Sequence, residues 1–180
     1  AFPGASQAGD CEECPAGKHS YDVGSTDCNG CGRGKYMFDD QGDMTCKECA
    51  VGRYSDGGAE FCYACEPGRY SNSQGFALCS MCSPGRYTGL GVYGSSSCDF
   101  DCPAGRFSSN AGSDNIADCH KCARGTYQFL NGSSTCIPCS PGSYTGSEGM
   151  KTCSLCAKNT FTSTFGSKAC IACHNGQVTS

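Results

Sequence analysis

Cysteine is the residue type whose abundance and spacing in this sequence could carry chemistry. The 180-residue chain holds 20 cysteines in ten pairs, nine spaced C-x2-C and one, Cys98 and Cys102, spaced C-x3-C. Such pairs bind structural zinc, carry out thiol redox reactions, or form disulfides. The candidate disulfide cysteines are Cys11, Cys14, Cys28, Cys31, Cys46, Cys49, Cys62, Cys65, Cys79, Cys82, Cys98, Cys102, Cys119, Cys122, Cys136, Cys139, Cys153, Cys156, Cys170 and Cys173.

The surroundings of the pairs favour disulfides over metal or redox chemistry. Two C-x2-C pairs about 13 residues apart also match a four-cysteine zinc site. Zinc knuckles, however, usually place glycine directly after the second cysteine, and only Gly32 stands there. A redox pair needs one isolated pair at a helix start, and no segment is typical of a helix. We expect no metal and no cofactor, and a multi-zinc cysteine protein is the alternative.

Cross-links would also replace a hydrophobic core that this composition cannot build. Leu, Ile, Val and Phe together number only 20, and there is no Trp, whereas ordering the chain costs roughly 1 to 2 kcal/mol per residue. Disulfides persist in oxidising compartments, so an exported protein is expected. The net charge of −4 argues against nucleic-acid binding. The longest apolar runs are far below the roughly 20 residues that span a bilayer.

The pairs divide residues 11–180 into ten repeats of about 18 residues, which follow an N-terminal segment, residues 1–10. We number the repeats 1 to 10 from the second cysteine of each pair, Cys14 to Cys173. The third residue after that cysteine, the turn residue, is Gly in nine repeats and Asn159 in the other. The fifth residue is Tyr or Phe in eight repeats, and the sixth is Ser or Thr in eight. The fourth residue before the next pair, the tip residue, is Gly except for Asn115 in repeat 6.

These fixed positions predict one short β-hairpin per repeat. Gly and Asn accept positive φ most readily, and Pro followed by Gly, as in three repeats, is the signature of a type II turn. Each repeat then consists of a turn, a strand, a second turn, a return strand and the next pair. The predicted fold class is small and disulfide-rich, an elongated tandem array of short β-hairpins with little or no helix, in which each aromatic lies over the adjacent disulfide.

The pattern resembles the ephrin-receptor-like cysteine-rich repeats of eukaryotic extracellular proteins, which are similar to the modules of tumour-necrosis-factor receptors. CSPGRYTG from Cys82, CPAGRFSS from Cys102 and CSPGSYTG from Cys139 carry the resemblance most plainly. It covers essentially the whole chain and implies an extracellular fold without implying a single function. Such repeats occur in receptors, adhesion proteins, surface coats of protists and flagellar hairs.

The disulfide partners should lie in neighbouring pairs, about 17 residues apart, because closing C-x2-C onto itself would strain the ring. The resemblance implies bonds from first to third and second to fourth cysteine within four-cysteine modules, beginning with Cys11 to Cys28 and Cys14 to Cys31. Five modules would then span residues 11–45, 46–78, 79–118, 119–152 and 153–180. A shifted grouping would leave both ends unpaired, and the sequence does not decide between the two.

The other polar residues form no catalytic constellation. His19, His120 and His174 are scattered without triad partners, so we expect no catalytic residue and no enzyme. The cluster of Asp39, Asp40 and Asp43 lacks the spacing of a calcium loop and is interpreted as a solvated hairpin tip. A basic residue stands fourth after the second cysteine in repeats 1 to 6, where it would be solvated, stack on Tyr, or form a stripe that binds acidic glycans. These residues are Lys18, Lys35, Arg53, Arg69, Arg86 and Arg106.

Two kinds of sugar attachment are chemically plausible if the chain is exported. Asn131-Gly132-Ser133 is an N-glycosylation sequon at a predicted hairpin tip, which makes Asn131 the candidate site. The Ser or Thr that follows each aromatic is either an acceptor of O-linked sugar or a residue that favours strands.

Together these features predict a non-enzymatic extracellular structural protein, a disulfide-stapled rod that acts as a spacer or as a subunit of a filament or surface coat. It would reach the cell surface or exterior through the secretory pathway. The alternative is a receptor or adhesion ectodomain that binds a protein or glycan. Repeat 10 stops before its return strand. If the chain is complete, the expected partner is a second copy joined head to tail, or other extracellular proteins and glycans, with no nucleic acid and no membrane span; if it is a fragment, longer versions should continue the repeat.

Overall fold

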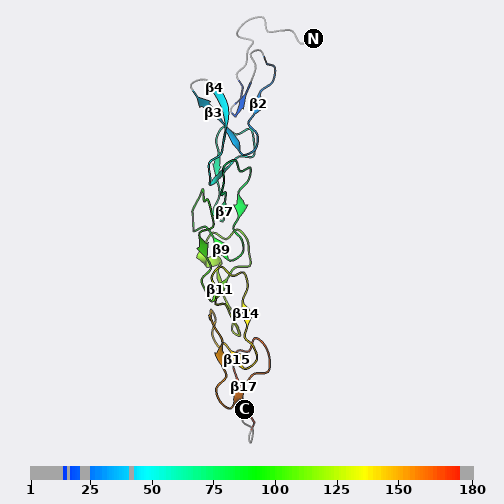
Figure 1. Cartoon of the computed structure of the whole chain (residues 1–180), viewed down its shortest axis with the longest axis vertical. Coiled ribbons are helices and arrows are strands. Elements are labelled where there is room, and N and C mark those ends of the chain that lie inside the picture. The colour runs from blue at the N-terminus through cyan, green and yellow to red at the C-terminus, as the bar shows by residue number, and fades with distance from the viewer. Residues whose placement is uncertain (1–13, 16, 21–24, 41–42, 175–180) are drawn as a thin grey trace. The chain divides into compact units, whose positions relative to one another are not determined.

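A tandem series of small hairpins makes up the chain in its computed structural model, which describes all residues except 1–13, 16, 21–24, 41–42 and 175–180 (Figure 1). The described residues contain nine two-stranded antiparallel sheets and one short 3-10 helix, η2 (Ile116–Asp118). The predicted tandem, disulfide-rich array of hairpins with almost no helix is confirmed.

Each hairpin pairs one strand with the next strand along the chain, and most strands are two residues long. The pairs are β1 (Lys18–His19) with β2 (Asn29–Gly30), β3 (Lys35–Asp40) with β4 (Asp43–Glu48), β5 (Arg53–Tyr54) with β6 (Tyr63–Ala64), β7 (Arg69–Tyr70) with β8 (Ser80–Met81), β9 (Arg86–Tyr87) with β10 (Phe100–Asp101), β11 (Arg106–Phe107) with β12 (His120–Lys121), β13 (Thr126–Tyr127) with β14 (Ile137–Pro138), β15 (Ser143–Tyr144) with β16 (Ser154–Leu155), and β17 (Thr160–Phe161) with β18 (Ile171–Ala172).

The chain forms two compact units. The first consists of Ala1–Cys65 with Ser71–Cys79, and the second of Glu66–Tyr70 with Ser80–Ser180. The first unit contains strands β1 to β6 and the second contains strands β7 to β18. Within the second unit the hairpins follow one another in chain order, as the labels from β7 to β17 show (Figure 1).

A tight turn opens each hairpin directly after the second cysteine. In repeat 6 the N–H of Arg106 donates to the C=O of Pro103 at 3.0 Å, and Gly105 between them has a φ of +86°. This positive φ at the third position of a four-residue turn is the type II geometry that the sequence predicts. The amide of Cys122 then donates to the C=O of Gly105 at 2.9 Å, which ties the next cysteine pair to the turn.

The return strand lies inside the next cysteine pair. Strand β12 is the two residues between Cys119 and Cys122. The expected order of a return strand followed by a pair is therefore wrong. The two residues between the paired cysteines form the return strand. This follows because most hairpins have only two residue pairs, and these lie next to the turn that opens the hairpin.

Among the described residues, backbone hydrogen bonds join repeats 2 and 3, and repeats 5 to 8, each to the next repeat. In repeat 7 the N–H of Gly125 donates to the C=O of Thr145 in repeat 8 at 3.0 Å. The tip Gly149 of repeat 8 donates its N–H to the C=O of Cys122 at 2.8 Å. Equivalent bonds recur in both units. Short strands that are too small to be stable alone thus gain their remaining hydrogen bonds from a neighbour.

The turn glycine also meets the tip of the repeat after next. A Cβ built on Gly105 would lie 2.1 Å from the carbonyl oxygen of Gly149, and one on Gly125 would lie 2.0 Å from that of Gly166. Gly17, Gly34, Gly68 and Gly85 make the same close approach to a tip two repeats on. Glycine is therefore required for two reasons: the backbone has a positive φ, and the neighbouring tip leaves no room for a side chain.

The tip residue of repeat 6 differs from its prediction. Asn115 has an extended φ of −142° and caps η2, where its side chain accepts a hydrogen bond from the N–H of Ala117. Gly112, with a φ of +79°, forms the tip instead and lies against Gly68. The spacer of this repeat is longer than the others, so the tip lies three residues before the predicted position. The extra residues between the tip and Cys119 form the short helix η2.

We predict that Gly105→Ala opens the contact between repeats 6 and 8. Gly142→Ala is the matched control, because Gly142 has the same turn position and a φ of +82° but no described atom within 4 Å of its built Cβ. Both changes carry a left-handed backbone cost of about 1–2 kcal/mol. Only Gly105→Ala adds a clash, so exchange of the Gly149 amide hydrogen should quicken by about tenfold or more. Equal exchange in the two variants would contradict the proposed role of this contact.

Candidate functional site

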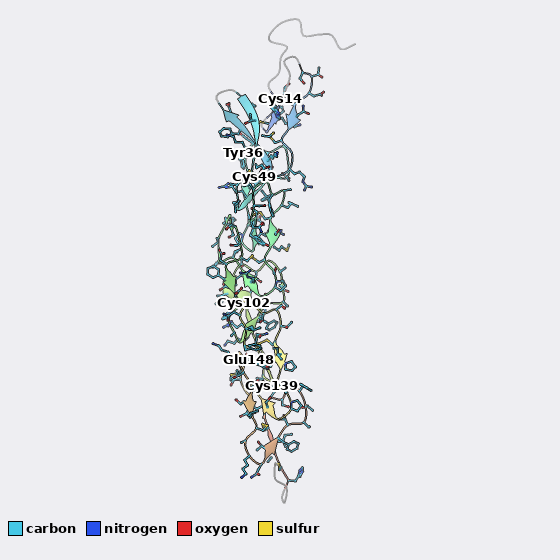
Figure 2. The ribbon with its side chains drawn as sticks, viewed as in Figure 1. Cys14, Tyr36, Cys49, Cys102, Cys139 and Glu148 are labelled. Carbon is cyan, nitrogen blue, oxygen red and sulfur yellow. A yellow bond between two sulfur atoms is a disulfide. The ribbon has the colours of Figure 1, made fainter. Side chains whose placement is uncertain are left out.

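The disulfides are the chemical feature that every repeat shares, and they form one regular series. The second cysteine of each pair bonds to the first cysteine of the next pair, so that every disulfide closes one hairpin (Figure 2). The bonds are Cys14–Cys28, Cys31–Cys46, Cys49–Cys62, Cys65–Cys79, Cys82–Cys98, Cys102–Cys119, Cys122–Cys136, Cys139–Cys153 and Cys156–Cys170.

The expected bonds from first to third and second to fourth cysteine are therefore wrong. Cys14 bonds to Cys28 rather than to Cys31, and Cys31 bonds to Cys46. Partners do lie in neighbouring pairs, with sequence separations of 13 to 17 residues. The reason is the return strand inside the next pair, which brings the first cysteine of that pair opposite the cysteine that precedes the turn.

The two ends of the series differ from the rest. Cys173, the second cysteine of the last pair, is a free and half-buried thiol. Cys11, the first cysteine of the first pair, lies outside the described residues. Within the described residues, every other cysteine is in a disulfide.

Buried sulfur and buried hydroxyl groups make up the interior. Cys82, Cys102 and Cys122 have no exposed surface, and neither do Ser55 and Ser71. The sixth residue after the second cysteine, which we call the inward slot, is buried in repeats 2 to 9. Its members are Met37, Ser55, Ser71, Thr88, Ser108, Gln128, Thr145 and Thr162.

Hydrogen bonds to the turn account for threonine in the inward slot. Thr145 Oγ1 accepts a bond from the N–H of Gly125 at 2.7 Å, and Thr88 Oγ1 accepts one from the N–H of Gly68 at 2.8 Å. A buried N–H must find such a partner. These hydroxyls are enclosed in the folded chain, so the expectation that they accept O-linked sugars is not supported there. The sequence shows an aromatic followed by Ser or Thr in most repeats, but it did not predict that the hydroxyl faces inward.

The aromatic residues one position earlier pack across their own hairpins. Tyr87 stacks on Phe100 with ring centroids 5.2 Å apart, and Phe107 meets His120 edge to face at 6.1 Å. These are cross-strand neighbours in the register of β9 with β10 and of β11 with β12. Such pairs contribute roughly 0.2–1 kcal/mol each. The ring contacts of Tyr87 and Phe107 are thus made with a residue that lies between the next two cysteines.

His19 occupies the aromatic position of repeat 1 and does lie beside a disulfide. It is buried, and its ring nitrogen is within 4.8 Å of the sulfur atoms of Cys31 and Cys46. Those two sulfurs are bonded to each other. A disulfide offers no thiolate to a metal ion, so this trio is a packing contact. His120 belongs to β12, and His174 ends the described chain.

The basic residues of the predicted stripe make different interactions, each with a partner in its own hairpin. Arg86 Nε lies 2.9 Å from Asp101 Oδ1, an exposed ion pair of modest stabilising effect. Arg53 Nη1 donates to the C=O of Cys62 at 3.0 Å, and Arg106 makes the same bond to Cys119 at 2.7 Å. A cation–π contact joins Lys47, which is not one of the predicted basic residues, to the ring of Phe38, with the Lys47 Nζ 3.2 Å from the ring centre.

The sequon residue Asn131 is exposed but anchored to its neighbour. Its Oδ1 accepts a hydrogen bond from the N–H of Ala104 at 2.9 Å, and the N–H of Gly132 donates to the C=O of Cys102 at 2.8 Å. The oxygen is retained when a glycan is linked to the side-chain nitrogen, so this contact is compatible with glycosylation. Of the acidic cluster, residues 41–42 lie outside the described residues.

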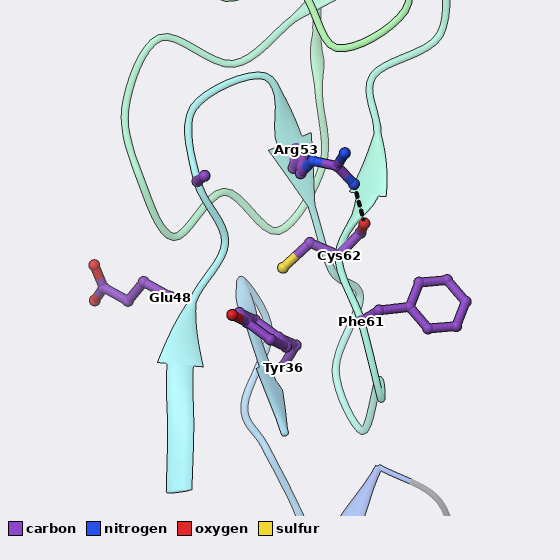
Figure 3. Close-up of a pocket in the computed structure, with 6 residues that line it drawn as sticks. Tyr36, Glu48, Arg53, Phe61 and Cys62 are labelled. Carbon is purple, nitrogen blue, oxygen red and sulfur yellow. Dashed lines mark hydrogen bonds between the residues drawn. The ribbon is translucent and has the colours of Figure 1, made fainter. Parts of the chain in front are cut away.

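An open cleft of about 360 Å³ lies in the first unit between β3, β5 and the chain before β6. Tyr36, Glu48, Arg53 and Phe61 line it. Figure 3 shows that Arg53 reaches the Cys62 carbonyl while Glu48 and Phe61 point away from the Tyr36 ring. The polar groups do not converge on one point, so the cleft shows no arrangement for acid–base or nucleophilic catalysis. Among the described residues, no helix has the length and hydrophobicity to cross a bilayer.

We predict that Cys98→Ser leaves Cys82 as the new free thiol. In the structure Cys98 is bonded to Cys82, whereas the pairing from first to third cysteine would release Cys79 instead. Alkylation of the native variant followed by peptide mass mapping measures which cysteine is labelled. The unmodified chain, in which Cys82 should stay unlabelled, is the control. Labelling of Cys79 would reject the observed pairing.

Comparison with known proteins agrees with this architecture. Residues 52–91, 114–151 and 142–180 match the family described as tyrosine-protein kinase ephrin type A/B receptor-like, and together these segments cover more than half of the chain. The human protein named signal peptide, CUB and EGF-like domain-containing protein 2 is 29% identical over 110 residues, which are 59% of this chain and 10% of that protein. The chain thus spans about a tenth of the length of this relative. With its C-x2-C pairs, turn glycines and hairpin disulfides, the chain belongs to the ephrin-receptor-like family of cysteine-rich repeats.

Proposed function

We propose that the chain is a non-enzymatic extracellular structural module whose disulfide series acts as a spacer, in a filament, stalk or surface coat. The observation that supports it most is the uniform pairing of each second cysteine with the next first cysteine. This pairing makes a continuous covalent path. The path crosses each hairpin through its disulfide, continues along the short segment between two paired cysteines, and enters the next disulfide, so it bypasses the hairpin loops. The location rests on the family and on the persistence of disulfides in oxidising compartments.

The covalent path limits how far a load can extend the chain. Each repeat contributes one disulfide, with a Cα–Cα distance of 5.5 to 5.8 Å, and the peptide steps of one cysteine pair, about 10 Å. A repeat that is pulled taut thus spans roughly 16 Å, whereas about 18 residues of unlinked chain span roughly 60 Å. Tension therefore passes from disulfide to disulfide and leaves each 13- to 17-residue loop unloaded.

The alternative function is that of a receptor or adhesion ectodomain which binds a protein or glycan. The open cleft beside Tyr36 and the exposed ring of Phe61 favour this alternative, because aromatic side chains are enriched at binding surfaces. The relative with CUB and EGF-like domains bears a name that is compatible with either role. A glycan on Asn131 would fit both.

Force spectroscopy on single chains tests the spacer function. The oxidised chain, held by handles at both ends, should show no release of loops between Cys14 and Cys170 at forces that unfold ordinary domains. After reduction by a phosphine, each opened hairpin should add about 45 Å of contour length. Chains that are reduced and alkylated beforehand are the control. Release of loop-sized increments from the oxidised chain would reject the mechanical role, and X-ray scattering would separately test the expected elongated shape.

A further inference from the structure

We propose that Phe129 is the platform on which the first N-acetylglucosamine of a glycan on Asn131 packs, so that this sugar is held against the hairpin tip of repeat 7. The proposal rests on the extracellular location proposed above, but not on the spacer function. It goes beyond both, because it assigns a sugar-binding role to an exposed aromatic residue. It is argued from the side-chain nitrogen of Asn131, the exposure of Phe129 and the hydrogen bonds that order the loop between them.

The side-chain amide of Asn131 has its oxygen held and its nitrogen available. Its Oδ1 accepts the N–H of Ala104 at 2.9 Å, and because only the oxygen can accept this bond, Nδ2 points away from that N–H. Asn131 is exposed, and within the part of the chain that the structure describes its Nδ2 donates no hydrogen bond. Attachment forms a bond from Nδ2 to C1 of the sugar and breaks the bond from C1 to the pyrophosphate of a lipid-linked oligosaccharide donor. The lipid pyrophosphate leaves with the proton from Nδ2.

Phe129 exposes an aromatic ring at a position where another repeat covers it. It is the seventh residue after the second cysteine, and its side chain is 55% exposed. The seventh residue of repeat 2, Phe38, is half-buried, and the Nζ of Lys47 lies over its ring. No described residue places a cation over the ring of Phe129. Its aromatic neighbour is Tyr127, whose ring is stacked with it at a centroid distance of 6.3 Å. The rest of the Phe129 ring surface is available to a ligand.

The inward-slot residue of repeat 7, Gln128, orders the loop between the aromatic residue and the sequon. Gln128 is buried, its Oε1 accepts the N–H of Leu130 at 3.1 Å, and its Nε2 donates to the C=O of Thr135 at 2.8 Å. Ser133 Oγ donates to the C=O of Leu130 at 3.2 Å. Both backbone groups of Leu130 are therefore bonded within the loop. A longer side chain than Ser or Thr in this slot thus fixes the loop that carries the sequon.

The first sugar of a glycan on Asn131 can reach Phe129. Two residues of chain span at most about 7 Å, so the Cα atoms of Phe129 and Asn131 are no further apart than this. An Asn side chain with a pyranose ring attached to it covers a distance of that size. The C–H groups on one face of a pyranose carry a partial positive charge, and the face of an aromatic ring is negative, so the two faces attract each other. The contact also buries apolar surface that Phe129 otherwise exposes to water.

A sugar held at this place would stabilise a junction of three repeats. The tip Gly132, next to Asn131, donates its N–H to the C=O of Cys102 in repeat 6 at 2.8 Å. Its own carbonyl oxygen would lie 2.2 Å from a Cβ built on the turn Gly85 of repeat 5. The contact between the sugar and Phe129 restrains the loop that carries Gly132. The amide hydrogen of Gly132 should therefore exchange more slowly when the sugar is present.

Proton NMR of the exported chain tests the contact directly. The chain is produced with an export signal in a eukaryotic host, mass mapping determines whether Asn131 carries a sugar, and an endoglycosidase trims the glycan to its first N-acetylglucosamine. The protons of this sugar should shift upfield, because they lie over the face of an aromatic ring. Phe129→Leu should abolish the shift, whereas Phe129→Tyr should retain it. Each variant is first shown by mass to contain the same number of disulfides as the unmodified chain.

A double-mutant cycle measures the stabilisation. In the glycosylated chain, Phe129→Leu should quicken exchange of the Gly132 amide hydrogen by about threefold or more, whereas in the sugar-free background of Ser133→Ala it should have no such effect. Ser133→Ala also removes a hydrogen bond of the loop, but this loss is common to both arms of the cycle. Phe165→Leu is the matched control, because Phe165 is 69% exposed beside the tip of repeat 9 and has no sequon near it. It should leave the exchange of Gly132 unchanged.

Three outcomes would overturn the proposal. The first is a secreted chain whose Asn131 carries no sugar, which would leave the extracellular location intact. The second is a set of sugar proton shifts that Phe129→Leu does not change. The third is an exchange rate of Gly132 that depends on Phe129 equally with and without the sugar. None of these outcomes alters the extension limit, which force spectroscopy tests separately.

Discussion

The close approach of a turn glycine to the tip two repeats on, which repeats 1, 2, 4, 5, 6 and 7 make, is the contact on which the rest of the structure depends. Two backbones meet there with no side chain between them, as Gly105 and Gly149 show. The contact is dictated by hard-sphere packing, and glycine alone satisfies it together with a positive φ. It fixes how neighbouring hairpins stack, and thus which backbone groups of successive repeats face each other.

The stacking lets sulfur and hydroxyl groups take the place of an aliphatic core. A disulfide that closes about 15 residues stabilises by about 3 kcal/mol on the chain-entropy model. Beside it, a buried Ser or Thr such as Thr145 satisfies the amide of the neighbouring turn at almost no cost in volume. Large aromatic residues are left at the half-exposed edges, where they pack on the residue between the next two cysteines.

In the spacer function proposed above, this arrangement would separate mechanical from binding properties. The disulfide path is the same in every hairpin that the structure describes, so the spacers and the residues between cysteines are free to vary. The variation is visible in charge, from the acidic first repeats to the lysines of repeats 8 and 9. One scaffold thus carries different surfaces along its length, as expected for repeats whose neighbours supply most of their stability.

The sequence by itself determined the repeat, the hairpin, the type II turn and the use of disulfides. These follow from local chemistry, since positive φ requires glycine and a thiol-rich chain with few aliphatic residues must be cross-linked. Only the tertiary structure decided which cysteines pair, because C-x2-C spacing is compatible with several partners until the return strand is located between them. It also decided that Gly112 rather than Asn115 forms a tip, and that the Ser or Thr after each aromatic faces inward. Both depend on contacts with other repeats, which a local pattern does not contain.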